Sequence, residues 1–210
     1  MTCDELPVVE YHYEDTRMNT IEELQTLLEK IGREEDAKTL VRLFLPPVTY
    51  DGHLVLNQRT AILMGSSEET ARTTFTGTLE IRTRKGGLAE LYNIAFEGKG
   101  GTGLKLSEGA YVQGCRFTGW DIGVDSREGS WAILTNCEFE TNGIGFRFDS
   151  MSATCSSQEY SGLLFRDNGI GVQLLHVPGD LPLGFTDCTF DENGTDIEDP
   201  KGLANVEQVR

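Results

Sequence analysis

Short apolar segments separated by polar turn residues fill the chain from residue 40 onward. Up to residue 96 they read LVRLFL, HLVL, AILM, TLEIRT and LAELYNIAF. Apolar and polar positions alternate in several of them, which is typical of strands that bury one face. No hairpin signal pairs neighbouring segments, and no helical pattern separates them. The pattern therefore predicts an all-β fold built from parallel strands.

One segment, residues 20–31 (TIEELQTLLEKI), predicts an α-helix. Thr20 and Glu23 form a capping-box pattern at its start, and Gly32 is expected to end it. Its apolar residues lie on one face: Ile21, Leu24, Leu27, Leu28 and Ile31. The residues before it are polar and acidic, so we expect an acidic N-terminal arm over residues 1–19.

A phenylalanine recurs at intervals of 21 to 26 residues in the rest of the chain: Phe96, Phe117, Phe139, Phe165 and Phe190. Cysteine lies two residues before three of them, at Cys115, Cys137 and Cys188. Three residues before each Phe is a residue type that accepts a left-handed backbone bend at low cost. These bend residues are Asn93, Gly114, Asn136, Gly162 and Asp187.

This period predicts a right-handed single-stranded parallel β-helix of about seven coils. Coils of three short strands stack at about 4.8 Å, so that like residues lie over like residues. The helix at 20–31 is expected to cap the N-terminal end, because a bare strand edge invites aggregation. The predicted parts are the arm (1–19), one β-helix domain (20–198) and a C-terminal tail (199–210).

The strand that follows each Phe predicts an outward column of alternating charge. By pattern the column runs Glu80, Lys105, Asp125, Arg147, Gln173 and Glu198. A second column pairs Arg127 with Asp149. We expect these to be surface ion pairs worth a few tenths of a kcal/mol each. The alternative is that Asp125 and Asp149 form a carboxylate pair for sugar chemistry or Ca²⁺. A neighbouring arginine is expected to keep each of them ionised, which suits neither role.

A row of glycines is expected to lie between these columns and to face outward: Gly123, Gly145 and Gly171. It predicts the bare floor of a trough, walled by the loops at 150–159 and 176–183. Trp120, which lies in a turn, and His176, which follows a ladder strand, are further candidates for ligand contact. An exposed indole can stack on a sugar ring.

Charge and cysteine content narrow the choice of partners. With 34 acidic and 18 basic residues the net charge is −16, which disfavours binding to nucleic acid or to an anionic membrane. The first residues show no secretory signal, so the cytoplasm is the expected compartment, with a domain excised from an exported protein as the alternative. There is no C-x-x-C pair among the five cysteines, and histidine is scarce, so we expect no metal site and no cofactor. The three cysteines of the repeat are expected to be reduced and buried, and Cys3 and Cys155 to be accessible.

Over residues 20–198 the chain resembles the pectin-lyase-like superfamily of parallel β-helices. Residues 40–65 resemble the entry coils of its pectin methylesterase branch. Asn93 and Asn136 match the stacked asparagine of the family's tight second turn, and the other bend residues substitute for it. The resemblance implies a substrate cleft on the strand after the third turn, which is the strand of the charge column.

The catalytic motifs of that superfamily are absent from this sequence. The Gln-Asp-Thr segment of methylesterases is missing, and its nearest analogue is GWDIGVD at 119–125. The Asn-Thr-Asp and Gly-His-Gly segments of polygalacturonases and the Trp-x-Asp-His segment of pectate lyases are missing as well. We therefore predict no catalytic residue.

The sequence favours a non-catalytic β-helix module that recognises a glycan or a protein through the cleft-side strand face. The candidate ligand-binding residues are Gly123, Gly145, Gly171, Trp120, Asp125, Arg147, Asp149, Gln173 and His176. Two alternatives stay open. One is a divergent carbohydrate-active enzyme of the lyase, hydrolase or esterase class, and the other is an acidic factor that occupies a basic site on a partner protein.

Overall fold

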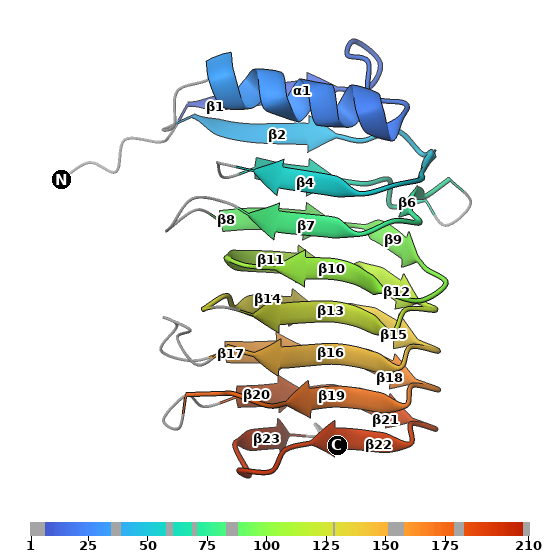
Figure 1. The fold of residues 1–210 in the computed structure, drawn as a ribbon, viewed down its shortest axis with the longest axis vertical. Helices are drawn as coiled ribbons and strands as arrows, with labels where there is room; N and C mark the ends of the chain where they lie inside the picture. The colour runs from blue at the N-terminus through green and yellow to red at the C-terminus, as the bar shows by residue number, and fades with distance from the viewer. Residues whose placement is uncertain are drawn as a thin grey trace, which may run out of the picture.

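The chain forms a tall stack of parallel strands with one helix lying across its top (Figure 1). The computed structural model describes residues 7–34, 39–57, 61–68, 71–82, 88–127, 129–150, 158–178 and 183–207. Every strand pairing described is parallel, and strands adjacent in a sheet are separated by a full turn of the chain. This confirms the all-β right-handed parallel β-helix. About five of its turns are regular, against the seven expected.

Three sheets run along the stack. The nine-stranded sheet consists of β1 (Val8–His12), β2 (Leu40–Phe44), β5 (Ala61–Met64), β8 (Leu88–Tyr92), β11 (Gly109–Gln113), β14 (Ala132–Thr135), β17 (Gln158–Ser161), β20 (Leu183–Thr186) and β23 (Ala204–Glu207). The phenylalanine sheet consists of β3 (Thr49–Tyr50), β6 (Thr73–Phe75), β9 (Ile94–Glu97), β12 (Arg116–Thr118), β15 (Glu138–Glu140), β18 (Leu164–Arg166) and β21 (Thr189–Asp191). The ladder sheet consists of β4 (Leu54–Asn57), β7 (Leu79–Arg82), β10 (Thr102–Leu106), β13 (Ile122–Arg127), β16 (Ile144–Asp149), β19 (Ile170–Leu174) and β22 (Thr195–Glu198).

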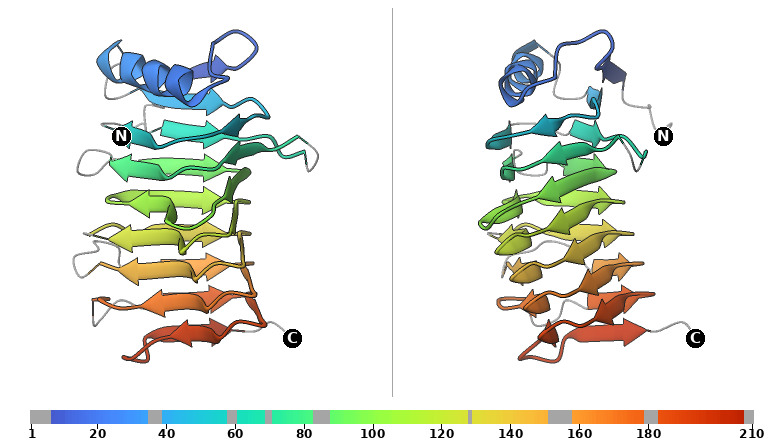
Figure 2. Two further views of the ribbon diagram at one scale, coloured as in Figure 1. Left: turned by 45° about the vertical axis from the view of Figure 1, so that its right-hand side comes forward. Right: turned by 90° about the vertical axis from the view of Figure 1, so that its right-hand side faces the viewer.

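Helix α1 (Ile21–Glu34) caps the N-terminal end, as predicted (Figure 2). Thr20 caps its start, because Glu23 N–H donates to Thr20 Oγ1 at 3.3 Å; the Glu23 carboxylate accepts from Asn19 N–H at 2.9 Å, one residue before the position of an ideal capping box. The apolar face buries Leu24, Leu27, Leu28 and Ile31. Gly32 does not end the helix, which continues for two more residues.

The segments outside the predicted β-helix domain contribute strands of their own. Residues 1–19 contain β1, which pairs with β2. Residues 199–210 contain β23, which pairs with β20. Both extend the nine-stranded sheet, so this sheet has two strands more than either of the others.

The interior contains a continuous column of aromatic rings. The five repeated phenylalanines stack at centroid distances of 4.7 to 5.1 Å, and Phe75 and Tyr50 continue the column toward the helix. Cys115, Cys137 and Cys188 are buried free thiols beside it, as predicted. The five bend residues all have φ between 51° and 63°, which confirms the left-handed bend.

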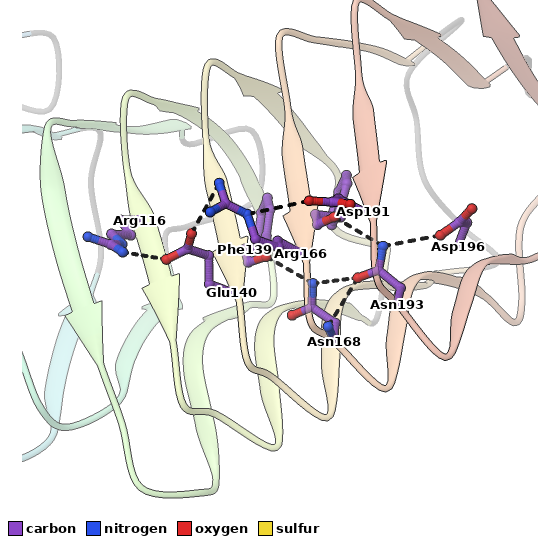
Figure 3. A network of polar contacts seen from close by, with 9 residues as sticks. Arg116, Phe139, Glu140, Arg166, Asn168, Asp191, Asn193 and Asp196 are labelled. Carbon is purple, nitrogen blue, oxygen red and sulfur yellow. Dashed lines mark hydrogen bonds and ion pairs between the residues drawn. The ribbon is translucent and has the colours of Figure 1, made fainter.

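The hydrogen-bonded asparagine column lies at a different corner from the one expected. Asn142, Asn168 and Asn193 each donate Nδ2–H to the carbonyl of the phenylalanine one turn earlier, at 2.9 to 3.0 Å. Consecutive members also bond to one another, since Nδ2–H of Asn168 reaches Asn193 Oδ1 at 2.9 Å (Figure 3). At the predicted corner the Oδ1 of Asn93 lies 2.5 Å from where a Cβ on Gly114 would stand. Glycine there makes room for the asparagine of the previous turn.

Candidate functional site

The outward column of the ladder sheet has the register that the sequence predicts. Lys105 is the strand partner of both Glu80 and Asp125. Asp125 pairs with Arg147, Arg147 with Gln173, and Gln173 with Glu198. Gln173 donates Nε2–H to Glu198 Oε2 at 2.8 Å. The predicted column is confirmed along its whole length.

Two carboxylates of this column are not at the surface, which corrects the expectation of weak surface pairs. The side chains of Glu80 and Asp125 are only 4% and 3% exposed. Arg147 holds Asp125 with two parallel bonds of 2.8 Å, from Nε to Oδ1 and from an Nη to Oδ2. Arg127 adds a third contact of 2.7 Å from its Nε to Oδ2. Bidentate arginine–carboxylate pairs out of water are geometrically rigid.

The pKa values of these two carboxylates move in opposite directions. Burial raises the pKa of Asp125 above its ordinary value, against the lowering effect of Arg127. Burial would also raise the pKa of Glu80, but the hydrogen bonds and charges of Arg82 and Lys105 outweigh it, so that pKa is lowered. Arg127 acts on Asp125 in the expected direction, toward the ionised form, but burial outweighs this effect.

Asp149 does not join Asp125 in a carboxylate pair open to substrate. Arg127 is the strand partner of Asp149, as predicted, yet its Nε forms an ion pair with Asp125 instead, 2.7 Å from Oδ2. Asp149 Oδ1 is bound by His176 Nδ1 at 2.7 Å, which brings together two of the predicted candidates. Among the residues that the structure describes, no three His, Cys, Asp or Glu side chains come together as a metal site.

The predicted glycine trough is wrong. Gly123, Gly145 and Gly171 are buried at the start of their strands, where the chain turns from the phenylalanine sheet into the ladder sheet. A Cβ on Gly145 would stand 2.9 Å from the Phe165 ring and 2.7 Å from the carbonyl oxygen of Gly171. Strict alternation of faces fails at this corner, so these glycines pack against the aromatic column. They form no floor for a ligand.

Trp120 is also unavailable for stacking on a ligand. Its side chain is buried, and Nε1–H donates to the carbonyl of Phe96 at 3.0 Å. This bond replaces the one that an asparagine makes in the later turns. The ring lies where a Cβ on Gly98 would stand, 2.3 Å from its Cδ2. Most of the predicted loop at 150–159, half of the loop at 176–183, and Cys3 and Cys155 lie outside the described residues.

A second ion-pair ladder, which sequence reasoning missed, runs along the phenylalanine sheet. Glu140 is bonded by Arg116 from the turn before, and its other oxygen lies 3.5 Å from Arg166 of the turn after. Arg166 Nε lies 3.9 Å from Asp191 (Figure 3). The signal was present one residue after Phe139, Phe165 and Phe190, where glutamate, arginine and aspartate alternate in sign.

A hollow lies between the capping helix and the first strands of the ladder sheet. We call it the helix cleft. It encloses about 550 Å³ and is lined by Gln25, Leu28, Glu29, Gly32, Arg33, Val55, Asn57 and Arg82. Gln25 Oε1 accepts Val55 N–H at 3.1 Å, which ties the helix to the edge strand β4. Sequence analysis missed this site. Its one signal was Gln25, a polar residue that lies on the apolar face of the helix, four residues after Ile21 and three before Leu28.

The helix cleft presents polar groups of several kinds. Arg33 bonds through Nε to the Glu29 carbonyl at 3.1 Å, and Arg82 bonds through Nε to Glu80 at 2.8 Å. A guanidinium carries five N–H donors, so each of these contacts uses one of five. Asn57 is the strand partner of Arg82 and adds an amide. Val55 of the lining is the strand partner of Glu80, the first residue of the charge column on the ladder sheet.

Neither a protein-family model nor a curated protein sequence matches this chain. Within the described ranges, no helix combines the length and the apolar character needed to cross a membrane.

Proposed function

We propose that this protein is a non-catalytic β-helix module that binds an acidic glycan at the helix cleft and along the adjoining face of the ladder sheet. The observation that carries the proposal is the lining of the helix cleft. Two guanidinium groups, two amides and one carboxylate meet over an apolar patch formed by Leu28 and Val55. Ligand sites typically combine an apolar lining with a few convergent polar groups.

The two arginines favour an anionic sugar over a neutral one. They outnumber Glu29, the one carboxylate of the lining, in a chain whose net charge is −16, so the cleft is less acidic than the molecule as a whole. Arginine matches a carboxylate with two parallel bonds. The resemblance to the pectin-lyase-like superfamily supports the same ligand class, because its substrate cleft lies on the corresponding strands.

The ion pairs of the ladder sheet support binding without catalysis. Glycoside hydrolysis needs two carboxyl groups about 5 to 10 Å apart, with one acting as a free acid and the other as a base or nucleophile. Asp125 is held by Arg147 and Arg127, Glu80 by Arg82 and Lys105, and Asp149 by His176. Each of these carboxylates is therefore occupied by a basic partner.

The test is calorimetric titration with tetragalacturonate, with its methyl ester as the uncharged comparison. We expect binding of the acid form and at least a tenfold weaker Kd in Arg33→Gln. Lys30→Gln is the matched control, because Lys30 lies on the same helix but pairs with Glu34 at 3.7 Å and does not line the cleft. Equal losses in both variants, or no binding at all, would overturn the proposal.

A turnover assay on the same sugars separates the module from the divergent enzyme. Product release that disappears in Arg33→Gln while the fold is intact would establish the enzyme in place of the module.

A further inference from the structure

The outer face of the nine-stranded sheet becomes less apolar from its N-terminal strands to its C-terminal strands. Its outward positions follow from the register, in which Arg42 pairs with Ile62, Ile62 with Glu90, Glu90 with Tyr111 and Tyr111 with Ile133. The adjacent outward column runs from Phe44 through Met64, Tyr92 and Gln113 to Thr135. From β17 onward the outward residues are small or polar, such as Ser161, Gly184, Thr186 and Asn205. Apolar side chains are thus concentrated between β2 and β14.

Aromatic rings stand on this face in fixed positions. Tyr111 is 38% exposed, the most exposed aromatic side chain of the sheet's interior strands. Its ring meets Trp131 edge to face, with centroids 5.4 Å apart and an interplanar angle of 77°. The Trp131 ring lies over Gly109, where an added Cβ would come within 2.4 Å of it. Trp131 is therefore seated on a bare backbone, and it supports Tyr111 from the side.

A hollow of about 260 Å³ lies beside these rings on β8, β11 and β14. It is lined by Glu90, Tyr92, Tyr111, Val112, Gln113, Ile133 and Thr135. Tyr92 donates its hydroxyl proton to Glu90 at 2.7 Å, which fixes the carboxylate at one side of the hollow. Gln113 and Thr135 are strand partners and add an amide and a hydroxyl on the other side. No lining residue is a cation.

The extent of the apolar stripe points to a small occupant. Five strands at about 4.8 Å each and two outward columns at about 6.8 Å each cover roughly 24 Å by 14 Å, or about 330 Å². A stable protein–protein interface needs about 800 Å² from each partner. This stripe is well below that extent, and the hollow within it is smaller still. An extended small ligand fits these dimensions better than a second copy of the chain.

We propose that this hollow, the tyrosine hollow, is a second binding site, which takes a neutral saccharide. A pyranose ring has an apolar face, which stacks on Tyr111, and hydroxyls, which are satisfied by Glu90, Gln113 and Thr135. The absence of a cation in the lining and the net charge of −16 disfavour an anionic sugar here. The site lies on a different sheet from the helix cleft and does not depend on it.

The experiment measures binding of three neutral hexasaccharides, cellohexaose, xylohexaose and mannohexaose, by calorimetry on the whole chain. We expect at least one to bind and its Kd to weaken at least tenfold in Tyr111→Ala. Gln113→Ala, at an exposed position, should weaken binding several-fold. Tyr13→Ala is the matched control, because Tyr13 is 39% exposed and lies outside the hollow. Its Kd should equal that of the wild type.

Three outcomes would overturn the proposal. One is that no neutral hexasaccharide binds, and another is that Tyr13→Ala and Tyr111→Ala weaken binding equally. The third is a sugar-independent dimer in sedimentation that Tyr111→Ala dissociates, since the face would then be a protein interface. Arg33→Gln should leave neutral-sugar binding unchanged, so failure at the helix cleft and failure here are distinguishable.

Discussion

Replacing Phe139 by alanine tests how the aromatic column stabilises the fold. The Phe139 side chain is fully buried between Phe117 and Phe165, with ring centroids 5.1 and 4.7 Å away. Phe→Ala in a core costs about 3–5 kcal/mol, and the cost rises with the cavity that remains. Strand spacing is fixed at about 4.8 Å by the backbone ladder on all three sheets, so the neighbouring rings have little freedom to close the gap. That range already includes lost ring contacts, and the loss of two of them, about 0.5–1.5 kcal/mol each, together with the unrelaxed cavity puts this site at its upper end. We expect about 4–5 kcal/mol.

The measurement is urea unfolding followed by circular dichroism, with Phe190→Ala as the matched control. Phe190 is only partly buried, and its one parallel stacking contact is with Phe165 at 5.1 Å. Its loss should cost about 1–2 kcal/mol less, because the site is less enclosed. A cost for Phe139→Ala below about 2 kcal/mol, or equal costs for both variants, would refute the argument that the backbone prevents collapse.

Three further predictions follow from the ion pairs and thiols. Asp125→Asn should destabilise the protein by about 3 kcal/mol at neutral pH, because it leaves the largely buried Arg147 without its counterion. Urea unfolding measures this cost, and a value under about 1 kcal/mol would mean that the pair contributes no more than a surface ion pair. Glu80 has a lowered folded pKa, so its contribution is present above its ordinary value of 4.5 and is lost as pH falls through the folded value. Thermal melts should therefore show a flatter acid limb in Glu80→Gln, and an unchanged limb would contradict the assignment. Burial raises the pKa of Cys115, Cys137 and Cys188, and that of Cys137 to about 12. A thiol reagent should therefore react with the native protein at no more than the two remaining cysteines. Fast reaction at any of the three buried cysteines would contradict their burial.

The repeated elements of this fold could be predicted from sequence because each turn repeats the same physical constraints. A phenylalanine that recurs near a cysteine and a bend residue is expected to stack on the equivalent phenylalanines of the neighbouring turns. The charged residues lie at a nearly constant number of residues after each phenylalanine, so their column could be predicted as well. The helical cap was equally readable, since its capping pattern and apolar face agree. Its end was misplaced because Gly32 costs only about 1 kcal/mol in a helix, and that cost does not force termination.

The candidate site could not be predicted in the same way. The orientation of Gly123, Gly145 and Gly171 was extrapolated from strand alternation, but these residues lie at a corner where alternation fails. The helix cleft joins residues from α1, β4 and β7, and no repeat relates the helix to the strands. The outer face of the nine-stranded sheet was not predicted as a site, because the family resemblance places the cleft on the ladder sheet. Its aromatic residues, Tyr92, Tyr111 and Trp131, were visible in the sequence.

Trp120 takes the place of an asparagine at the N-terminal end of the asparagine column, and this limits where further turns can be added. An asparagine side chain both donates to the earlier turn and accepts from it, as Asn142 does when its Oδ1 receives Trp120 N–H at 3.0 Å. An indole N–H only donates. The chain of side-chain bonds therefore starts at Trp120 and can be lengthened only on its C-terminal side. Duplication of a whole turn there, such as residues 142–167, would add one more asparagine link and one more ring to the column. A design that lengthens the solenoid by asparagine-bearing turns should therefore add them on the side of Trp120 away from the helical cap.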